Sequence, residues 1–307
     1  MLAKIGYFLF VLPFSHLPLF VLYLFTDLFY FMLITVVPYR KKVIEGNIKR
    51  SFPQLTDKER KIIKRRFYRH FTDMLAEGVK NLSLSKSGYK KRFKVKNPEL
   101  MNDLFTENKD VLLVSGHYNN WEWLITSQGF LFPHQPFGIG MPMTSKFWDT
   151  KINEKRSRFG MNVIHGKNYK EELKKDTEKP KAVLVLSDQS PGNSSKSYWM
   201  NFLNQPTAVL FGTEIMAHQL DYAVVGFITR KIKRGYYEME LKLITDNPKS
   251  MNWGKITEAH VGLLEKEIVS YPQYWLWSHK RWKREVPADL NELKNEQRTL
   301  FNEKFNK

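Results

Sequence analysis

The chain has 307 residues, of which 42% are apolar, so it has enough apolar material for a packed core and is not disordered throughout. Its 49 Lys and Arg against 31 Asp and Glu give a formal net charge of +18, which indicates an anionic partner such as nucleic acid, an acidic protein or a membrane surface. The absence of cysteine excludes disulfides, cysteine-ligated zinc, iron–sulfur clusters and a thiol nucleophile.

The N-terminal segment is the most apolar part of the chain. Between residues 5 and 37 the only Lys, Arg, His, Asp or Glu side chains are His16 and Asp27. The best uninterrupted piece, Leu19–Val37, approaches the roughly 20 residues that a membrane-spanning helix needs. We therefore expect an N-terminal hydrophobic membrane-anchor helix, which either spans the membrane or re-enters it, because Asp27 is costly in hydrocarbon. A buried core hairpin is the alternative, whereas a cleaved signal peptide is disfavoured because no small-residue cleavage site follows.

Prolines and charges refine this expectation. Pro13 and Pro18 interrupt the segment, so a short piece, Ile5–Leu12, should precede the main helix. Only Lys4 precedes the apolar run, whereas five basic residues follow it: Arg40, Lys41, Lys42, Lys49 and Arg50. Because positive residues stay on the cytoplasmic side, the body of the protein is expected there.

A basic amphipathic helix is predicted next. The capping-box pattern Thr56-Asp57-Lys58-Glu59 marks its start, and apolar residues follow at helical spacing from Ile62 to Leu75. Its other face carries Lys61, Lys64, Arg65 and Arg69. This face is either simply solvated or lies against phospholipid headgroups.

Strands and helices alternate beyond this point. Apolar runs predict buried strands, and an alternating segment predicts a half-buried edge strand; together they are Val111–Val114, Ala182–Leu186, Ala223–Thr229 and Tyr237–Ile244. Helical stretches are expected from Asn119, at Lys151–Phe159, Lys170–Thr177 and Thr213–Gln219, and after Pro287. The fold class is α/β, with a largely parallel central sheet flanked by helices. We divide the chain into a membrane anchor at residues 1–40 and a catalytic domain at residues 41–307.

The block around Gly116 and His117 is the most informative for chemistry. Gly116 allows a tight turn after a buried strand, and a carboxylate, Glu122, follows the histidine by five positions. A glutamate at this spacing can reach back to Nδ1 and raise the basicity of Nε2, which suits removal of a proton from an alcohol. A hydrogen-bonded loop histidine is the plainer alternative. No nucleotide-binding, dinucleotide-binding or zinc-peptidase motif is present, and a Ser115/His117/Asp188 hydrolase lacks the nucleophile elbow.

Several blocks together resemble one known family, the bacterial lipid A biosynthesis acyltransferases (lauroyl and myristoyl transferases), within the wider His-x4-Asp/Glu glycerolipid acyltransferase group. The resemblance covers essentially the whole chain. After the apolar N-terminus it rests on Tyr39–Val43 with Asn47 and Ser51–Pro53, Gly116-His117 with Glu122, Asp188-Gln189, and Tyr274–Lys283.

The resemblance implies the roles of individual residues. By position, His117 would be the general base on an acceptor hydroxyl and Glu122 its orienting carboxylate. Arg158 or Arg156, ahead of Phe159-Gly160, would bind acceptor phosphate or the thioester oxyanion. The residues expected to bind substrate or shape the site are Asn120, Arg156, Arg158, Asp188, Gln189 and Arg230, with Asp188 and Gln189 in no proton-transfer role.

The resemblance also implies partners and a location. A fatty acyl chain would pass from an acyl thioester, in most cases on acyl carrier protein, to a hydroxyl of an anionic lipid A precursor at the cytoplasmic face of the inner membrane. No metal, cofactor or nucleic acid is expected. The aromatic and basic run Tyr274–Lys283 would form an interfacial belt, with core packing of Trp275 and Trp277 as the alternative.

One segment departs from the family pattern. After Asp-Gln the family commonly has Phe-x-Pro-Phe-Phe-Gly, whereas this chain has Tyr198–Leu203, which is apolar but altered. Acyl length and acceptor identity therefore stay open, and another glycolipid or an aminolipid is an alternative acceptor. A non-catalytic, membrane-tethered basic binding protein is the alternative of a different class.

Overall fold

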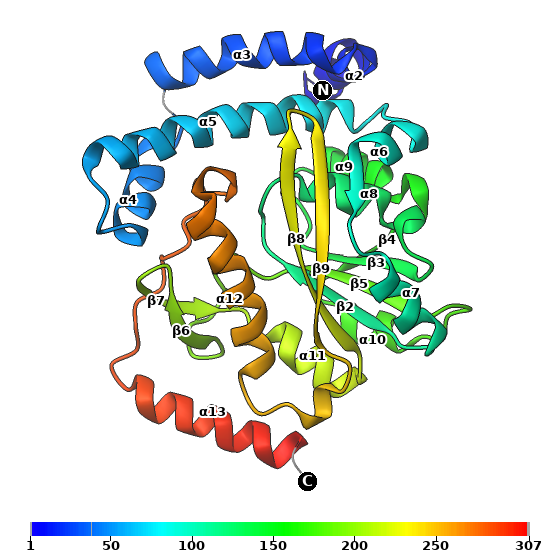
Figure 1. Cartoon of the computed structure of the whole chain (residues 1–307), viewed down its shortest axis with the longest axis vertical. Coiled ribbons are helices and arrows are strands. Elements are labelled where there is room, and N and C mark those ends of the chain that lie inside the picture. Colours follow the sequence, from blue (N-terminus) through cyan, green and yellow to red (C-terminus); the bar gives the residue numbers. More distant parts are fainter. Residues whose placement is uncertain (1, 38, 306–307) are drawn as a thin grey trace.

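The structure is a computed structural model that describes residues 2–37 and 39–305. Its centre is a seven-stranded sheet in the order β1-β9-β8-β2-β5-β3-β4 (Figure 1). The strands are β1 (Phe93–Val95), β2 (Val111–Ser115), β3 (Gln135–Gly140), β4 (Asn162–His165), β5 (Lys181–Leu186), β8 (Ala223–Lys233) and β9 (Tyr236–Thr245). All neighbouring strands are parallel except β8 and β9, which pair antiparallel. A separate antiparallel hairpin consists of β6 (Tyr198–Phe202) and β7 (Gln205–Val209).

Helices cover both faces of the sheet. Val111 and Leu113 of β2 pack in one apolar cluster with residues of α3, α5 and α8, whereas Leu112 and Val114 pack in another with α10, α11 and α12. This alternation is the two-residue period of a strand buried on both faces. The helices are α1 (Leu2–Gly6), α2 (Leu12–His16), α3 (Leu19–Thr35), α4 (Lys41–Ser51), α5 (Asp57–Lys80), α6 (Lys86–Arg92), α7 (Glu99–Thr106), α8 (Trp121–Leu131), α9 (Lys146–Arg156), α10 (Tyr169–Lys174), α11 (Gly212–Leu220), α12 (Lys255–Ser270) and α13 (Leu290–Phe305). Short 3-10 turns lie at Ser157–Phe159, Pro248–Ser250 and Pro272–Tyr274, and a π-helical turn at Tyr7–Val11 joins α1 to α2.

The N-terminal helices lie along the folded body. Figure 1 shows α3 running beside α5 across one end of the molecule. Leu19, Leu22 and Tyr23 face inward and belong to the same apolar cluster as β2. The opposite side of these helices is exposed and apolar, and it includes Phe8, Leu9, Phe10, Phe20, Leu24, Phe25, Leu28 and Phe31.

Asp27, which the apolar sequence left unexplained, is paired with arginines. Its carboxylate forms an ion pair with Arg69 at 2.9 Å and also pairs with Arg234. Among the residues that the structure describes, no helix combines the length and the apolar character required to cross a bilayer, so the expected spanning helix is not confirmed. The buried-hairpin alternative does not hold either, because one whole side of α3 is exposed.

Most of the predicted elements are present. The capping box of Thr56 and Glu59 starts α5, and the apolar runs are the core strands β2, β5 and β8. The prediction of an edge strand at Tyr237–Ile244 is wrong in one respect, because this strand, β9, lies between β1 and β8 and not at the edge of the sheet. The α/β fold with a mostly parallel sheet is confirmed.

Candidate active site

The sheet register brings His117 and Asp188 together. Ser115 of β2 is paired with Leu186 of β5, and each functional residue lies two positions beyond its strand. Because the strands are parallel, both loops leave the same edge of the sheet, where ligands commonly bind in α/β folds. Gly116 is required between them, because a Cβ atom there would lie 2.7 Å from Cγ of Asp188 and 2.5 Å from a methyl group of Leu264.

The loop after Gly116 is held by polar contacts on both sides. Asn119 adopts a left-handed conformation with φ of 52°, which asparagine tolerates better than most residues. Its side-chain amide donates to the carbonyl of Thr229 at 2.7 Å, and its backbone N–H donates to the carbonyl of Tyr274 at 3.0 Å. The histidine loop is therefore fixed to β8 and to the C-terminal segment.

Asp188 holds the His117 ring. Nδ1 of His117 lies 2.6 Å from Oδ1 of Asp188, and the backbone N–H of His117 donates to Oδ2 at 2.9 Å. The indole Nε1 of Trp275 also donates to Oδ2, at 2.8 Å. Burial alone would raise the pKa of Asp188, but the His117 ring, the His117 N–H and the Trp275 indole lower that pKa to about 2.

An ionised Asp188 sets the tautomer of the ring. A carboxylate only accepts hydrogen bonds, so Nδ1 of His117 carries a proton and Nε2 of the neutral ring presents a lone pair. The side-chain amide nitrogen of Gln189 lies 3.3 Å from Nε2 and can donate to it. The arrangement therefore presents a basic nitrogen at the surface of a buried aspartate–histidine pair.

A cavity of about 340 Å³ adjoins His117 and Gln189. Its walls are mostly apolar and come from β3, β4, β5, α8, α9 and nearby loops, with Trp121, Ile125, Ile139, Met141, Met143, Ile152, Val163, Leu184, Leu186 and Leu210 among the lining residues. Its polar lining residues are His117, Gln189, Asp149 and Arg156. Such a cavity suits an apolar substrate whose reacting polar group lies beside the imidazole.

Glu122 does not occupy the place expected for it. Its carboxylate pairs with Lys155 at 2.9 Å and with the guanidinium of Arg156, whereas Nδ1 of His117 faces Asp188. Burial opposes ionisation of Glu122, but these two cations lower its pKa to about 2. The cause is the direction of α8, which carries Trp121 against the His117 ring and Glu122 toward α9. The expected contact between Glu122 and His117 is therefore corrected to one between Asp188 and His117.

The two candidate arginines are separated by the structure. Arg156 lines the cavity beside His117, and Glu122 orients its guanidinium. Arg158 instead donates to the backbone carbonyls of Asn81, Leu82 and Leu84, at 3.0, 2.6 and 2.8 Å. Arg158 thus ties the end of α9 to the segment after α5 and does not line the cavity.

Two further expected substrate-binding residues have structural partners. Asn120 is buried and caps α8, with its Oδ1 accepting from the N–H of Trp123 and its Nδ2 donating to Glu77 at 2.5 Å. Arg230 pairs with Glu267 at 2.7 Å and with Glu240 at 2.6 Å. Neither Asn120 nor Arg230 lines the cavity beside His117.

The C-terminal segment Tyr274–Lys283 packs against the site. Trp275 and Trp277 are 2% and 0% exposed, so the interfacial-belt interpretation is wrong for these two rings and the core-packing alternative is correct. Sequence reasoning also missed the contact of Trp275 with Asp188, which no local spacing indicates. His279 accepts a hydrogen bond from the backbone N–H of Ser190 and so anchors the loop that carries Asp188. Within residues 2–37 and 39–305, no group of three His, Asp or Glu side chains is placed to hold a metal ion.

Comparisons with known proteins identify the family of the chain. Residues 5–284 match the family model described as bacterial lipid A biosynthesis acyltransferase. The chain is 21% identical over 250 residues to the lipid A biosynthesis lauroyltransferase of Escherichia coli (strain K12), an alignment that covers 80% of this chain and 79% of that protein.

Proposed function

The chain belongs to the family of bacterial lipid A biosynthesis acyltransferases and is an acyltransferase, and we propose that His117 is its general base. The acceptor is a hydroxyl of a lipid A precursor, and the donor is an acyl thioester on acyl carrier protein. One observation carries the proposal: the basic nitrogen of His117 faces an apolar cavity, while the buried carboxylate of Asp188 holds the other ring nitrogen.

The proposed reaction is a single acyl transfer. Nε2 of His117 takes the proton of the acceptor hydroxyl as the oxygen attacks the thioester carbonyl carbon. The carbon–sulfur bond then breaks, and the departing thiolate recovers the proton from the imidazolium. Asp188 stabilises the positive charge that develops on the ring, as a buried carboxylate does in triad enzymes. Arg156, fixed by Glu122, supplies positive charge at the cavity wall for the oxyanion or an acceptor phosphate.

The acyl chain and its acceptor are both lipids, which supports a location at the inner membrane. We propose that the exposed apolar side of α1–α3 enters the cytoplasmic leaflet without crossing the bilayer. Phe20, Leu24, Phe25 and Leu28 supply apolar area for such an interfacial contact. The net charge of +18 favours the acidic carrier protein, so its binding is expected to weaken as salt concentration rises.

Mass spectrometry of lipids tests the proposal directly. Cells that lack the gene should lose one acyl mass from a lipid A species, and the wild-type gene should restore it. His117→Ala should fail to restore the acyl mass, because removal of the base costs about 10²–10⁴-fold in rate. His165→Ala is the matched control, since His165 lies on β4 outside this cavity. Restoration by His117→Ala would reject the general-base role, and loss of the acyl group from another lipid would reassign the acceptor.

A further inference from the structure

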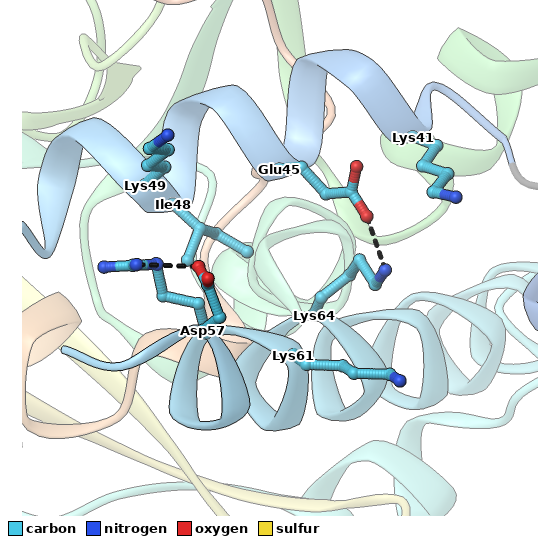
Figure 2. Close-up of a pocket in the computed structure, with 8 residues that line it drawn as sticks. Lys41, Glu45, Ile48, Lys49, Asp57, Lys61 and Lys64 are labelled. Carbon is cyan, nitrogen blue, oxygen red and sulfur yellow. Dashed lines mark hydrogen bonds and ion pairs between the residues drawn. The ribbon is translucent and has the colours of Figure 1, made fainter.

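A second, strongly basic groove lies between α4 and α5. It has a volume of about 440 Å³ and is lined by Lys41, Glu45, Ile48 and Lys49 of α4 and by Asp57, Arg60, Lys61 and Lys64 of α5. The residues recur at helical spacing, so each helix turns one face toward the groove. Figure 2 shows the two faces opposed, with Glu45 and Lys64 meeting across the gap.

The carboxylates of the groove already have partners. Lys64 Nζ lies 2.6 Å from Oε1 of Glu45, and Arg60 lies 2.8 Å from Oδ1 of Asp57. Arg60 also donates to the carbonyl of Phe52 at 3.1 Å. These contacts neutralise two of the five cations, so the groove keeps an excess of three positive charges (five minus two).

Three lysines are left for a ligand. Lys41, Lys49 and Lys61 are exposed, and among the described residues none of them forms a salt bridge, although Lys49 is near enough to Asp57 to help lower the pKa of that carboxyl. Figure 2 shows Lys41 and Lys49 on α4 and Lys61 on α5, so both walls contribute an available ammonium group. Ammonium groups of this kind bind phosphate as point charges.

The position of the groove indicates the source of the phosphate. Val36 and Val37, at the end of the apolar N-terminal segment, are 72% and 59% exposed, and Lys41 begins α4 only four residues later. Tyr39 lies between them and stacks on Phe71 of α5. An apolar surface that continues through a tyrosine into lysines matches the order of acyl chains, interface and headgroups in a bilayer.

We propose that the α4–α5 groove binds the phosphate of an anionic phospholipid headgroup when the protein lies on a membrane. The proposal rests on the membrane association proposed above for α1–α3, and it adds a headgroup site away from the cavity beside His117. Each lysine near an anionic surface contributes about 1 kcal/mol, so the groove supplies lipid selectivity that the apolar helices lack.

Vesicle co-sedimentation tests this assignment. Lys49→Gln/Lys61→Gln removes one lysine from each wall, and Lys170→Gln/Lys174→Gln makes the same charge change on α10, far from α4 (Figure 1). With phosphatidylcholine vesicles containing phosphatidylglycerol, the groove variant should bind about 30-fold more weakly than wild type, and the α10 variant should bind like wild type. With phosphatidylcholine alone, all three proteins should bind equally.

Other outcomes would overturn the proposal. Equal losses in both variants would mean that net charge alone attracts the membrane, and no loss in the groove variant would mean that the groove is not a headgroup site. Saturable binding of inorganic phosphate without vesicles, lost in the groove variant, would reassign the groove to free phosphate. Weaker binding of acyl carrier protein by the groove variant, with unchanged vesicle binding, would reassign it to the carrier. If wild type binds no vesicle at all, the membrane association proposed for α1–α3 fails as well.

Discussion

Asp188 and Glu77 are both buried carboxylates that hold the loop between β2 and α8, but their partners differ. Asp188 accepts hydrogen bonds from His117 and Trp275, and its pKa is lowered to about 2 although burial opposes this. Glu77 on α5 accepts hydrogen bonds from the hydroxyls of Tyr23 and Tyr237, both at 2.7 Å, and from Asn120. Burial raises the pKa of Glu77 despite these donors and a nearby lysine.

Burial raises the pKa of both carboxylates, and only at Asp188 do the hydrogen-bond partners and the nearby ring outweigh it. Asp188 contacts the titratable ring of His117, which faces a cavity, so the negative charge of Asp188 acts on that ring. Glu77 stands among neutral donors from α3, β9 and the cap of α8, so it joins three elements. We therefore expect changes at Asp188 to affect rate and changes at Glu77 to affect stability.

The largest effect is expected from Asp188→Asn. The amide keeps the shape but leaves the imidazolium without its counter-charge and can impose the wrong tautomer on His117, so kcat should fall about 10²–10⁴-fold. Steady-state assays with an acyl thioester measure the fall, and circular dichroism checks the fold. Wild-type kcat in this variant would remove Asp188 from the mechanism.

Glu77→Ala should lower the free energy of unfolding by about 3 kcal/mol or more, because three buried donors lose their acceptor. Urea unfolding measures this loss, with Glu296→Ala, an exposed glutamate on α13, as the matched control. A Glu77 variant as stable as its control would mean that the three donors find other partners.

Gly116→Ala tests the close approach of the two loops. The added methyl group would displace Asp188 or Leu264, and a misplacement of this size costs about 10²-fold in rate. Gly262→Ala is the control, because a Cβ atom there meets nothing within 4 Å. Equal kcat in the two variants would show that the Asp188 loop has room to move.

The pH dependence of stability should have opposite signs at the two carboxylates. Asp188 has its pKa lowered from 3.8 to about 2, so its stabilisation, about 2 kcal/mol, is complete above pH 4 and is lost as pH falls toward 2. The pKa of Glu77 is raised above 4.5, so its contribution is complete below that pH and is lost as pH rises.

Two variants distinguish the pH dependence of stability at Asp188 from that at Glu77. The destabilisation by Asp188→Asn should shrink as pH falls from 4 to 2. The destabilisation by Glu77→Gln should shrink as pH rises above 4.5. Urea midpoints across a pH series measure both trends. Parallel curves for the two variants would contradict the comparison.

The smallest effect is expected from Tyr23→Phe, which removes one hydrogen bond between α3 and Glu77 and should cost about 1 kcal/mol. Tyr30→Phe on the same helix is the control, because its ring contacts Arg69 through the π face, which the phenylalanine retains. Urea unfolding of both variants gives the difference. Equal stabilities would show that the Tyr23 hydroxyl contributes nothing to holding α3.

Sequence patterns predicted the elements that are continuous and apolar, and they failed where tertiary pairing decides. β2, β5 and the first part of β8 are mostly apolar, whereas β3 contains Pro136, Gly138 and Gly140 and gave no strand signal. The α4 and α12 helices, and the β6–β7 hairpin, were not predicted from their sequences at all.

Only some of the residues predicted for the candidate site lie together, because Asn120, Arg158 and Arg230 do not line the cavity beside His117. His117, Gln189 and Arg156 do meet at one cavity. Local spacing favoured Glu122 as the partner of His117, because a helical turn can bring together two side chains that are close in the sequence. The partnership with Asp188 depends on the register of β2 against β5 across 71 residues, which spacing along the chain does not contain.

The attachment of α3 to the body has a practical consequence for the protein. Leu19, Leu22 and Tyr23 share an apolar cluster with β2, and Asp27 pairs with Arg234 of the β8–β9 turn. A truncation after residue 40, the usual way to make a membrane-associated enzyme easier to purify, would therefore open the core. It would also remove Tyr23 as a partner of Glu77 and Asp27 as a partner of Arg234. Purification of the intact chain in detergent is the better preparation. The detergent covers the exposed apolar side of α3 and leaves its buried side packed on the core.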